Sequence, residues 1–207
     1  MSAQMTPFTR KKKAVKSSNG ASRKGPAKVI AFANQKGGVA KTTTALNLAV
    51  AFKESGHRVL AVDMDPQGNL TMSQGVDPDK VEKSMFDVLV HHIPLSEIIV
   101  EREIDVAVAS IDLAGAEIAM STQIGRERSL KKAIDAVRDD YDFVCIDTPP
   151  SLGLLTVNAL TAADKVIVPV QCDRYSHWTG TITLSAAVSA LTVSRPRLGG
   201  VSMQTKS

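Results

Sequence analysis

The sequence predicts an α/β protein with a doubly wound, mostly parallel sheet. Its short apolar runs lack polar alternation, which is typical of strands that are buried on both faces. These runs alternate with longer segments of helical periodicity, as in parallel sheets whose connections are helices. Aromatic residues make up 4% of the 207 residues and apolar residues 43%, so a sizeable core has to come from Val, Ile, Leu and Ala.

Five apolar runs are predicted as strands, and the fourth ends at two prolines that cannot continue it. They are residues 28–34, 58–64, 104–110, 141–150 and 165–171. Five further segments are predicted as helices from their apolar spacing, the first of them followed by Gly56 as a terminating glycine. They are residues 42–55, 81–90, 95–100, 126–140 and 154–163. Residues 66–79 are rich in Gly, Asn, Asp and Pro, which predicts a loop or short pieces.

Composition excludes several classes of protein. No run of 18 uncharged apolar residues occurs, so no membrane-spanning helix is expected, and the N-terminus has no apolar segment typical of a secretory signal. Cys145 and Cys172 lack the pair spacing of a metal site, and we expect reduced thiols in a cytosolic protein. His91 and His92, and Arg126 and Arg128, are expected on the surface.

Positive charge is concentrated at the N-terminus. Residues 1–28 hold eight of the 25 Lys and Arg residues and no acid, separated by Ser, Gly, Pro and Asn. We expect residues 1–27 to be a disordered basic tail. The tail is either a solubilising leader or an arm that holds nucleic acid through phosphate contacts without reading its sequence.

Ligands of doubly wound sheets bind at the carboxyl ends of the strands, which directs attention to residues 35–44, 63–69, 147–152 and 170–175. The first segment lies within "NQKGGVAKTTT", residues 34–44. Its glycines allow the backbone to approach a ligand closely, and a helix that starts after them offers N–H groups to a phosphate. In such a loop Lys41 would reach the β- and γ-phosphates, and the Thr42 hydroxyl would be a Mg²⁺ ligand.

Two acidic segments follow strands at matching positions. "VDMDPQGN", residues 62–69, places Asp63 and Asp65 at the end of the second predicted strand, two residues apart and so on the same side. "FVCIDTPPSLG", residues 143–153, is an apolar strand that ends in Asp147. A carboxylate on a rigid strand end can hold Mg²⁺ through water, and we assign this Walker B role to Asp147.

These segments together resemble the ParA/MinD group of P-loop ATPases. The loop departs from G-x-x-x-x-G-K-[ST] but matches the group's deviant motif K-G-G-x-x-K-[ST] at Lys36, Gly37, Gly38, Lys41 and Thr42. "IDLAGAEIAM" (111–120) and "AADKVIVPVQCD" (162–173) are also similar to this group, and "DPQGN" favours ParA. The resemblance covers residues 28–173 and implies a P-loop NTPase type of fold.

The resemblance implies ATP and Mg²⁺ as cofactors and a set of site residues. Lys36, Lys41 and Asp65 would be catalytic: Lys36 reaches the nucleotide of a partner subunit, and Asp65 orients the attacking water. The nucleotide would be bound by Lys36, Gly37, Gly38, Val39, Ala40, Lys41, Thr42 and Thr43. Metal contacts would come from Thr42, Asp63 and Asp147. The group usually has Gly at the position of Ala40; a negative φ would cost Ala40 little, whereas a positive φ would introduce strain.

The same resemblance implies an ATPase that dimerises on ATP, binds DNA non-specifically and works with a ParB-like partner in chromosome or plasmid segregation. Such a protein is cytoplasmic and nucleoid-associated and has no membrane partner. Residues 174–207 do not match the group and are expected to be an atypical segment, in which residues 183–193 form a weak helix. A non-enzymatic nucleotide-binding or interaction fragment and a MinD-like positioning ATPase are the alternatives.

Overall fold

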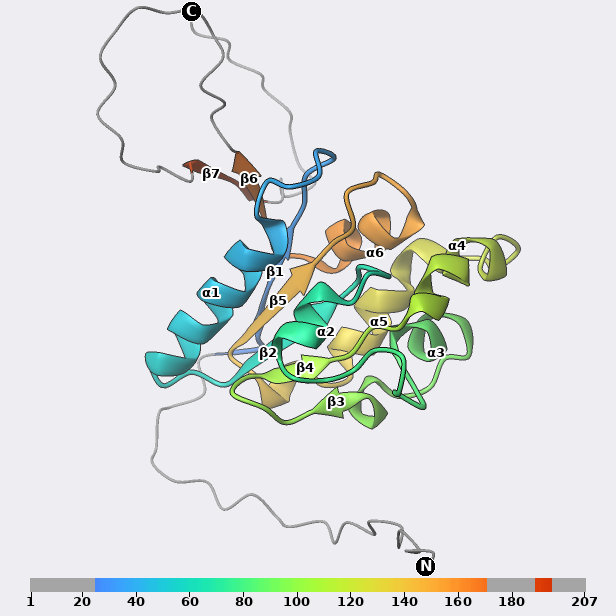
Figure 1. The fold of residues 1–207 in the computed structure, drawn as a ribbon, viewed down its shortest axis with the longest axis horizontal. Helices are drawn as coiled ribbons and strands as arrows, with labels where there is room; N and C mark the ends of the chain where they lie inside the picture. Colours follow the sequence, from blue (N-terminus) through green and yellow to red (C-terminus); the bar gives the residue numbers. More distant parts are fainter. Residues whose placement is uncertain (1–24, 171–188, 195–207) are drawn as a thin grey trace, which may run out of the picture.

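A seven-stranded sheet forms the centre of the computed structural model, which describes residues 25–170 and 189–194 (Figure 1). The strand order is β3-β4-β2-β5-β1-β6-β7. The five inner strands are parallel to one another: β4 (Asp105–Ala107), β2 (Val59–Asp63), β5 (Phe143–Asp147), β1 (Lys28–Phe32) and β6 (Lys165–Val170). They correspond to the five predicted strands, which confirms the predicted doubly wound, mostly parallel sheet.

Two antiparallel strands complete the sheet at its edges. β3 (Ile99–Val100) pairs with β4, and β7 (Ser189–Ser194) pairs with β6. The prediction of a helix at residues 95–100 is therefore wrong beyond a single 3₁₀ turn, η1 (Leu95–Glu97). The β-branched pair Ile99 and Val100 gains ladder partners and packs against the core, which outweighs its weak helical pattern. The helix expected at residues 183–193 is likewise a strand from Ser189 onward.

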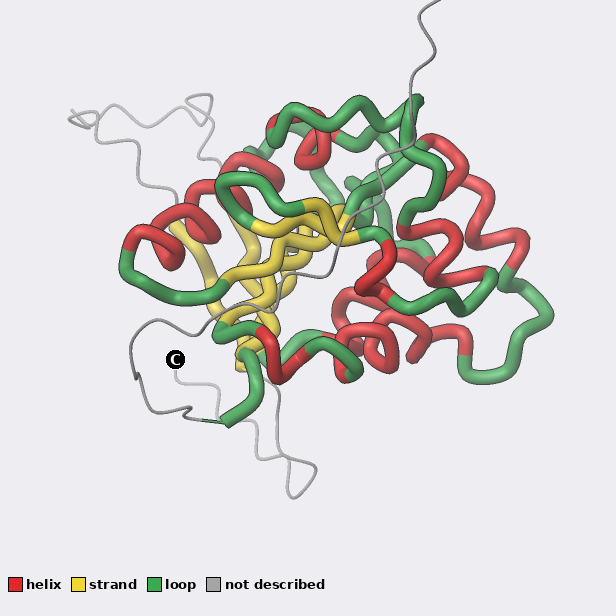
Figure 2. Tube along the Cα trace, turned by 90° about the horizontal axis from the view of Figure 1, so that it is seen from below, coloured by secondary structure: helices red, strands yellow, loops and turns green. Residues whose placement is uncertain are grey.

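Helices lie on both sides of the sheet, as Figure 2 shows in red beside the yellow strands. The α-helices are α1 (Lys41–Glu54), α2 (Asn69–Ser73), α3 (Met85–Val90), α4 (Ala116–Ala119), α5 (Ser129–Asp135) and α6 (Leu154–Ala162). Further 3₁₀ turns are η2 (Ile111–Gly115), η3 (Arg126–Arg128) and η4 (Arg138–Asp140). The short α2 lies within residues 66–79, where short pieces were predicted.

The predicted helix at residues 126–140 is broken into η3, α5 and η4. Arg138 ties the last of these turns to the residues next to β1 and β6. Its carbonyl accepts a hydrogen bond from the Ala27 N–H at 3.2 Å, and its Nε donates to the Ala27 carbonyl at 2.8 Å. Its guanidinium also pairs with Asp164. The N–H groups of Val137 and Asp140 bond to the carbonyls three residues earlier, at 3.0 Å each, so the last part of the predicted helix is wound as a 3₁₀ turn.

Local signals set the ends of α1 and α3. Gly56, with φ of +86°, follows the last turn of α1, and the His57 N–H returns to the Phe52 carbonyl at 3.1 Å. The predicted terminating role of Gly56 is confirmed. At the start of α3, Ser84 accepts from the Phe86 N–H, while the Asp87 carboxylate accepts from the Ser84 N–H at 2.9 Å.

The core consists mostly of aliphatic side chains on the inner strands and on the helix faces that cover them. Every residue of β2 is buried, and β5 is buried from Val144 onward. At the amino end of the sheet, the rings of Phe52 and Phe143 stack with centroids 3.9 Å apart. Cys145 is fully buried, as its position in an apolar strand predicts, and burial raises the pKa of its thiol to about 12.

Surface placement is confirmed for His91, His92, Arg126 and Arg128, all of which are exposed. Among residues 25–170 and 189–194, no helix is both long and apolar enough to span a membrane. The prediction of a disordered tail concerns residues 1–27, of which the structure describes only residues 25–27. Cys172 lies outside the described residues. The same holds for most of residues 174–207, where only β7 is described.

Candidate functional site

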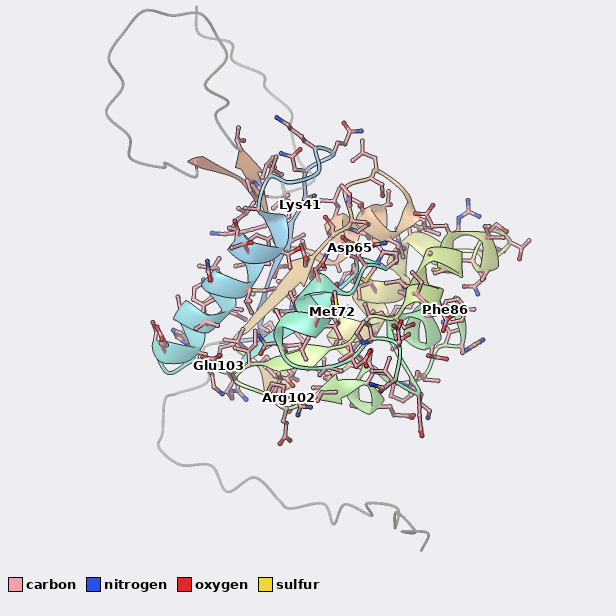
Figure 3. The ribbon with its side chains drawn as sticks, in the orientation of Figure 1. Lys41, Asp65, Met72, Phe86, Arg102 and Glu103 are labelled. Carbon is pink, nitrogen blue, oxygen red and sulfur yellow. The ribbon has the colours of Figure 1, made fainter. Side chains whose placement is uncertain are left out.

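A cleft of about 540 Å³ opens at the carboxyl ends of β1, β2 and β5. Its lining residues come from the β1–α1 loop, the start of α1, the β2–α2 loop, α2 and the loop after β5. They are Gly37, Gly38, Ala40, Lys41, Thr42, Thr43, Leu46, Asp65, Gln67, Asn69, Ser73 and Pro150. Lys41 and Asp65 lie at this end of the sheet in Figure 3, and Arg102 and Glu103 lie at the opposite end. The cleft lies where the doubly wound fold predicts a ligand.

The β1–α1 loop has two residues in the left-handed region. Gly38 has φ of +72°, and Ala40, directly before α1, has φ of +58° and ψ of +35°. The sequence allowed either a negative or a positive φ at Ala40, and the structure has the positive one. An L-residue with a Cβ atom pays about 1–2 kcal/mol in this conformation. Ala40 thus keeps a backbone shape that glycine would adopt at lower cost.

Asn34 fixes the entry to this loop, a role that sequence reasoning missed. Its Oδ1 accepts from the Lys36 N–H at 2.9 Å, and its Nδ2 donates to the Pro169 carbonyl at 2.8 Å. One amide side chain therefore joins the loop to the carboxyl end of β6. An Asn after a strand is a known turn former, which is the signal that would have pointed to it.

The two lysines of the loop differ in environment. Lys41 is buried, with 7% of its surface exposed, and its Nζ donates to the Lys36 carbonyl at 3.4 Å. Lys36 is exposed and is not among the lining residues of the cleft. The loop therefore presents one cation inward to the cleft and a second cation at the surface.

Asp147 is an orphaned carboxylate at the tip of β5. It is fully buried, and within the described ranges neither Oδ1 nor Oδ2 has a hydrogen-bond partner of normal geometry. Burial raises its pKa to about 7, and Asp63 and Asp65 add to this, while the Thr42 hydroxyl and Lys41 oppose it. An unpartnered buried carboxylate is costly, so its presence favours a ligand that the protein has to bind.

Asp63 ends β2 beside Asp147 but has a different environment. Its Oδ1 accepts from the Asp65 N–H at 3.1 Å, and its Oδ2 accepts from the N–H and the hydroxyl of Thr71 at 2.8 and 2.7 Å. Burial raises its pKa to about 6, against the effect of the Thr71 bonds. Because both oxygens are already engaged, this geometry favours a role in shaping the loop after β2 over the metal contact expected from the sequence.

Asp65 faces the cleft from that loop, with 7% of its surface exposed. Its Oδ1 accepts from the Gln67 N–H at 3.0 Å. A carboxylate held by one backbone bond and open to a cleft can also accept a hydrogen bond from water. Gln67, Asn69 and Ser73 line the same cleft and were not singled out from the sequence, although the DPQGN loop contains the first two.

The residues present fit a magnesium ion that is shared with phosphates. Thr42 lies in the first turn of α1 next to Asp147, whose oxygens are orphaned. In residues 25–170 and 189–194, no three His, Cys, Asp or Glu side chains are grouped to hold a metal by themselves. Mg²⁺ usually keeps several waters and binds through one or two protein groups plus substrate phosphates, so a sparse donor set of this kind suits it.

Most of the predicted site residues meet at the cleft. Gly37, Gly38, Ala40, Lys41, Thr42, Thr43 and Asp65 line it, and Asp63 and Asp147 are buried beside it at the strand tips. Val39 is buried and Lys36 is exposed, and neither is a lining residue. A second, smaller hollow of about 200 Å³ includes Ser96, Asp105 and Tyr141 and belongs to the other end of the sheet.

Comparison with known proteins gives concordant matches. A family model described as an AAA domain matches residues 27–195. Sporulation initiation inhibitor protein Soj of Bacillus subtilis is 51% identical over 152 residues, which cover 72% of this chain and 60% of Soj. Chromosome partitioning protein ParA of Myxococcus xanthus is 43% identical over 152 residues, which cover 72% of this chain and 54% of ParA.

Among solved structures, the crystal structure of cobyrinic acid a,c-diamide synthase from Mycobacterium smegmatis with bound ATP analogue and magnesium is 50% identical to this chain. It superposes with a TM-score of 0.71 over 73% of this chain and 63% of that protein. The chain thus spans about three-fifths of the length of the proteins that it matches.

Proposed function

The chain belongs to the ParA/MinD-type P-loop ATPases, and from this premise we propose that it binds Mg-ATP and hydrolyses it as a partition ATPase. One observation carries the proposal. The loop with Lys41 and Thr42, the loop with Asp65, and the orphaned Asp147 converge on a single cleft. The relatives named Soj and ParA support the biological setting.

The β1–α1 loop would bind the triphosphate. The N–H groups that begin α1 and the Lys41 ammonium favour an anion at this point. Lys41 donates to the Lys36 carbonyl at 3.4 Å, a long bond that phosphate oxygens can replace. Lys36 would serve the nucleotide of a partner subunit, for which its exposed position is suitable.

Hydrolysis would depend on positioning and charge stabilisation more than on covalent chemistry. Thr42 and, through water, Asp147 would hold magnesium, which when bound neutralises phosphate charge. Asp65 would accept a hydrogen bond from the attacking water and so orient it. Asp63 would not contact the metal, because its two carboxylate oxygens already accept hydrogen bonds from Asp65 and Thr71.

The wider function is proposed in the same way. We propose an ATP-dependent homodimer, non-specific DNA binding with a contribution from the basic residues 1–27, a ParB-like partner and a nucleoid-associated location. The ATPase domain would extend from residue 28 to at least residue 173. The family match to residue 195 and the pairing of β7 with β6 support extending this domain into the segment that the sequence set apart.

The alternative is a nucleotide-binding fragment without turnover. It is favoured by one observation, namely that the chain covers 60% of Soj and 54% of ParA. Light scattering of the intact chain with ATP and Mg²⁺ distinguishes the two functions. Dimers that form with ATP and persist in Asp65→Ala, together with loss of turnover in Asp65→Ala, support the ATPase.

Nucleotide binding without dimers or turnover supports the fragment. Lys41→Ala serves as the binding-deficient variant, and Lys53→Ala, an exposed lysine in the last turn of α1, is its matched control. If Lys41→Ala and Lys53→Ala bind ATP equally well, the cleft is not the nucleotide site.

A further inference from the structure

Thr71 lies at the point where three elements meet behind the cleft. It is fully buried in α2, and its hydroxyl donates to Asp63 Oδ2 at 2.7 Å. The same hydroxyl oxygen accepts from the Ala109 N–H at 3.0 Å, just after β4. The Thr71 N–H also donates to Asp63 Oδ2, at 2.8 Å. One side chain therefore joins α2 to the carboxyl ends of both β2 and β4.

The Asp63 carboxylate receives both ends of the segment between β2 and Thr71. One oxygen accepts from the Asp65 N–H and the other accepts from Thr71. One bond within this segment tightens it, from the Gly68 N–H to the Asp65 carbonyl at 2.9 Å, and the next residue along the chain, Met72, donates back to the Gly68 carbonyl at 2.8 Å. Residues 65–71 are thus a closed loop whose two ends share one carboxylate.

This closed loop carries three of the residues that line the cleft: Asp65, Gln67 and Asn69. The nucleotide-binding loop is built separately, between β1 and α1, and the bonds of the Thr71 hydroxyl go to Asp63 and Ala109 instead. The position of Asp65 in the cleft therefore depends on the hydrogen bonds between Asp63 and Thr71. The position of the phosphate-binding loop does not depend on them.

We propose that Thr71 is a positioning residue for ATP hydrolysis, which holds Asp65 where it meets the attacking water. The inference rests on the proposed ATPase function. Without the hydroxyl, the Ala109 N–H loses its acceptor and Asp63 Oδ2 loses a donor, so the closed loop loosens at its far end. Because displacements of about 1 Å can cost about 100-fold in rate, turnover falls while nucleotide binding is retained.

Three Thr71 variants of the full chain test this role. Thr71→Val keeps the shape and removes the hydroxyl; Thr71→Ser keeps the hydroxyl and removes the methyl group. Ser110→Ala is the matched control, because it removes another buried hydroxyl, one residue after Ala109, which is hydrogen-bonded to the Ser84 hydroxyl at 2.9 Å. Should Thr71→Val not fold, Thr71→Ala against Thr71→Ser makes the same comparison.

The expected result is a fall in kcat of about tenfold or more in Thr71→Val, with the Kd for a fluorescent ATP analogue within about twofold of the original. Thr71→Ser restores kcat, and Ser110→Ala leaves it unchanged. A second readout needs no nucleotide: amide hydrogen exchange in residues 65–70 is faster in Thr71→Val than in Ser110→Ala.

Two outcomes overturn the assignment while leaving the ATPase intact. The first is an unchanged kcat in Thr71→Val. The second is a rise in the Kd for ATP that is large enough to account for the whole loss of turnover. Thr71→Ser behaving like Thr71→Val would show that the methyl group matters and the hydroxyl does not. If the original chain binds no ATP, the proposed function fails first, and hydrogen exchange still reports whether Thr71 holds the loop.

Discussion

Asp63 and Asp147 are register partners at the carboxyl ends of the adjacent parallel strands β2 and β5, yet only Asp63 has its hydrogen bonds satisfied. Both side chains are completely buried. Three donors from the loop after β2 surround Asp63, whereas neither oxygen of Asp147 has a partner of normal geometry in the described part of the chain. Neighbouring carboxylates of the same type therefore differ in environment: Asp63 shapes the loop after β2, and Asp147 is the one proposed to hold magnesium.

Replacing Asp147 should stabilise the protein and remove its function. Asp147→Asn keeps the shape but removes a buried charge without partners, and we expect the free energy of unfolding to rise by about 1–3 kcal/mol without nucleotide. Mg²⁺-dependent stabilisation by ATP should be lost. Differential scanning calorimetry with and without Mg-ATP measures both. Asp63→Asn is the control and should be destabilised, because the NH₂ group of its amide would face N–H or O–H donors of Asp65 or Thr71.

The gain from Asp147→Asn should depend on pH in metal-free buffer. The pKa of Asp147 is raised in the folded protein to about 7, from an ordinary value of 3.8, so the folded state holds its proton over that interval. Stability contributed by this group is therefore full below pH 3.8 and is lost as the pH rises through 7. The Tm difference between Asp147→Asn and the original chain should be small at pH 5 and largest at pH 8. A difference that does not change between these values would contradict the prediction.

Ala40→Gly should make the protein more stable. Removing the strain of an alanine in the left-handed region should raise the free energy of unfolding by about 1–2 kcal/mol. The greater conformational freedom of glycine in the unfolded chain should lower it again by about 0.4–1 kcal/mol. A rise in Tm of a few degrees is expected in thermal unfolding without nucleotide. Gly38→Ala is the reverse control: φ there is +72° and nothing lies within 4 Å of the added Cβ, so backbone strain alone should lower Tm.

Gly68→Ala should destabilise the loop that carries Asp65. Gly68 has φ of +62°, and a Cβ there would lie 3.1 Å from Pro78 Cβ. Strain and overpacking together should cost about 1–3 kcal/mol in urea unfolding. Gly75→Ala has a similar φ of +72° with no atom within 4 Å, and should lose only the strain. Equal losses in the two variants would mean that Pro78 moves away freely.

The central sheet and the place of the cleft could be predicted because strand signals and strand-end signals agree. Apolar runs predict the five inner strands, and four of these runs lead into the segments at residues 35–44, 63–69, 147–152 and 170–175 where a ligand was expected. The edge strands could not be found in this way. Ile99 and Val100 form a strand because β4 offers a ladder, and the bonds of Arg138 to Ala27 join residues 111 positions apart in the sequence.

Within the site, residue types could be predicted but their hydrogen bonds could not. The sequence placed Asp63 and Asp147 at strand tips, and resemblance gave both a metal contact. The difference between them comes from Thr71, eight residues after Asp63, whose hydroxyl turns inward. Asn34 and Pro169 are similarly joined across 135 residues, a distance over which no local pattern carries information. The left-handed φ of Ala40 also follows from the fold and not from its residue type.

The shared register of β2 and β5 limits how this protein can evolve. Side chains alternate between the two faces of a strand, so inserting or deleting one residue in either strand would turn its terminal aspartate to the opposite face. Aliphatic residues within the strands can be exchanged for one another while the tips stay aligned. Changes of length should therefore accumulate at the amino edge of the sheet and in its outer connections, and the two runs that end in Asp63 and Asp147 should keep a constant number of residues.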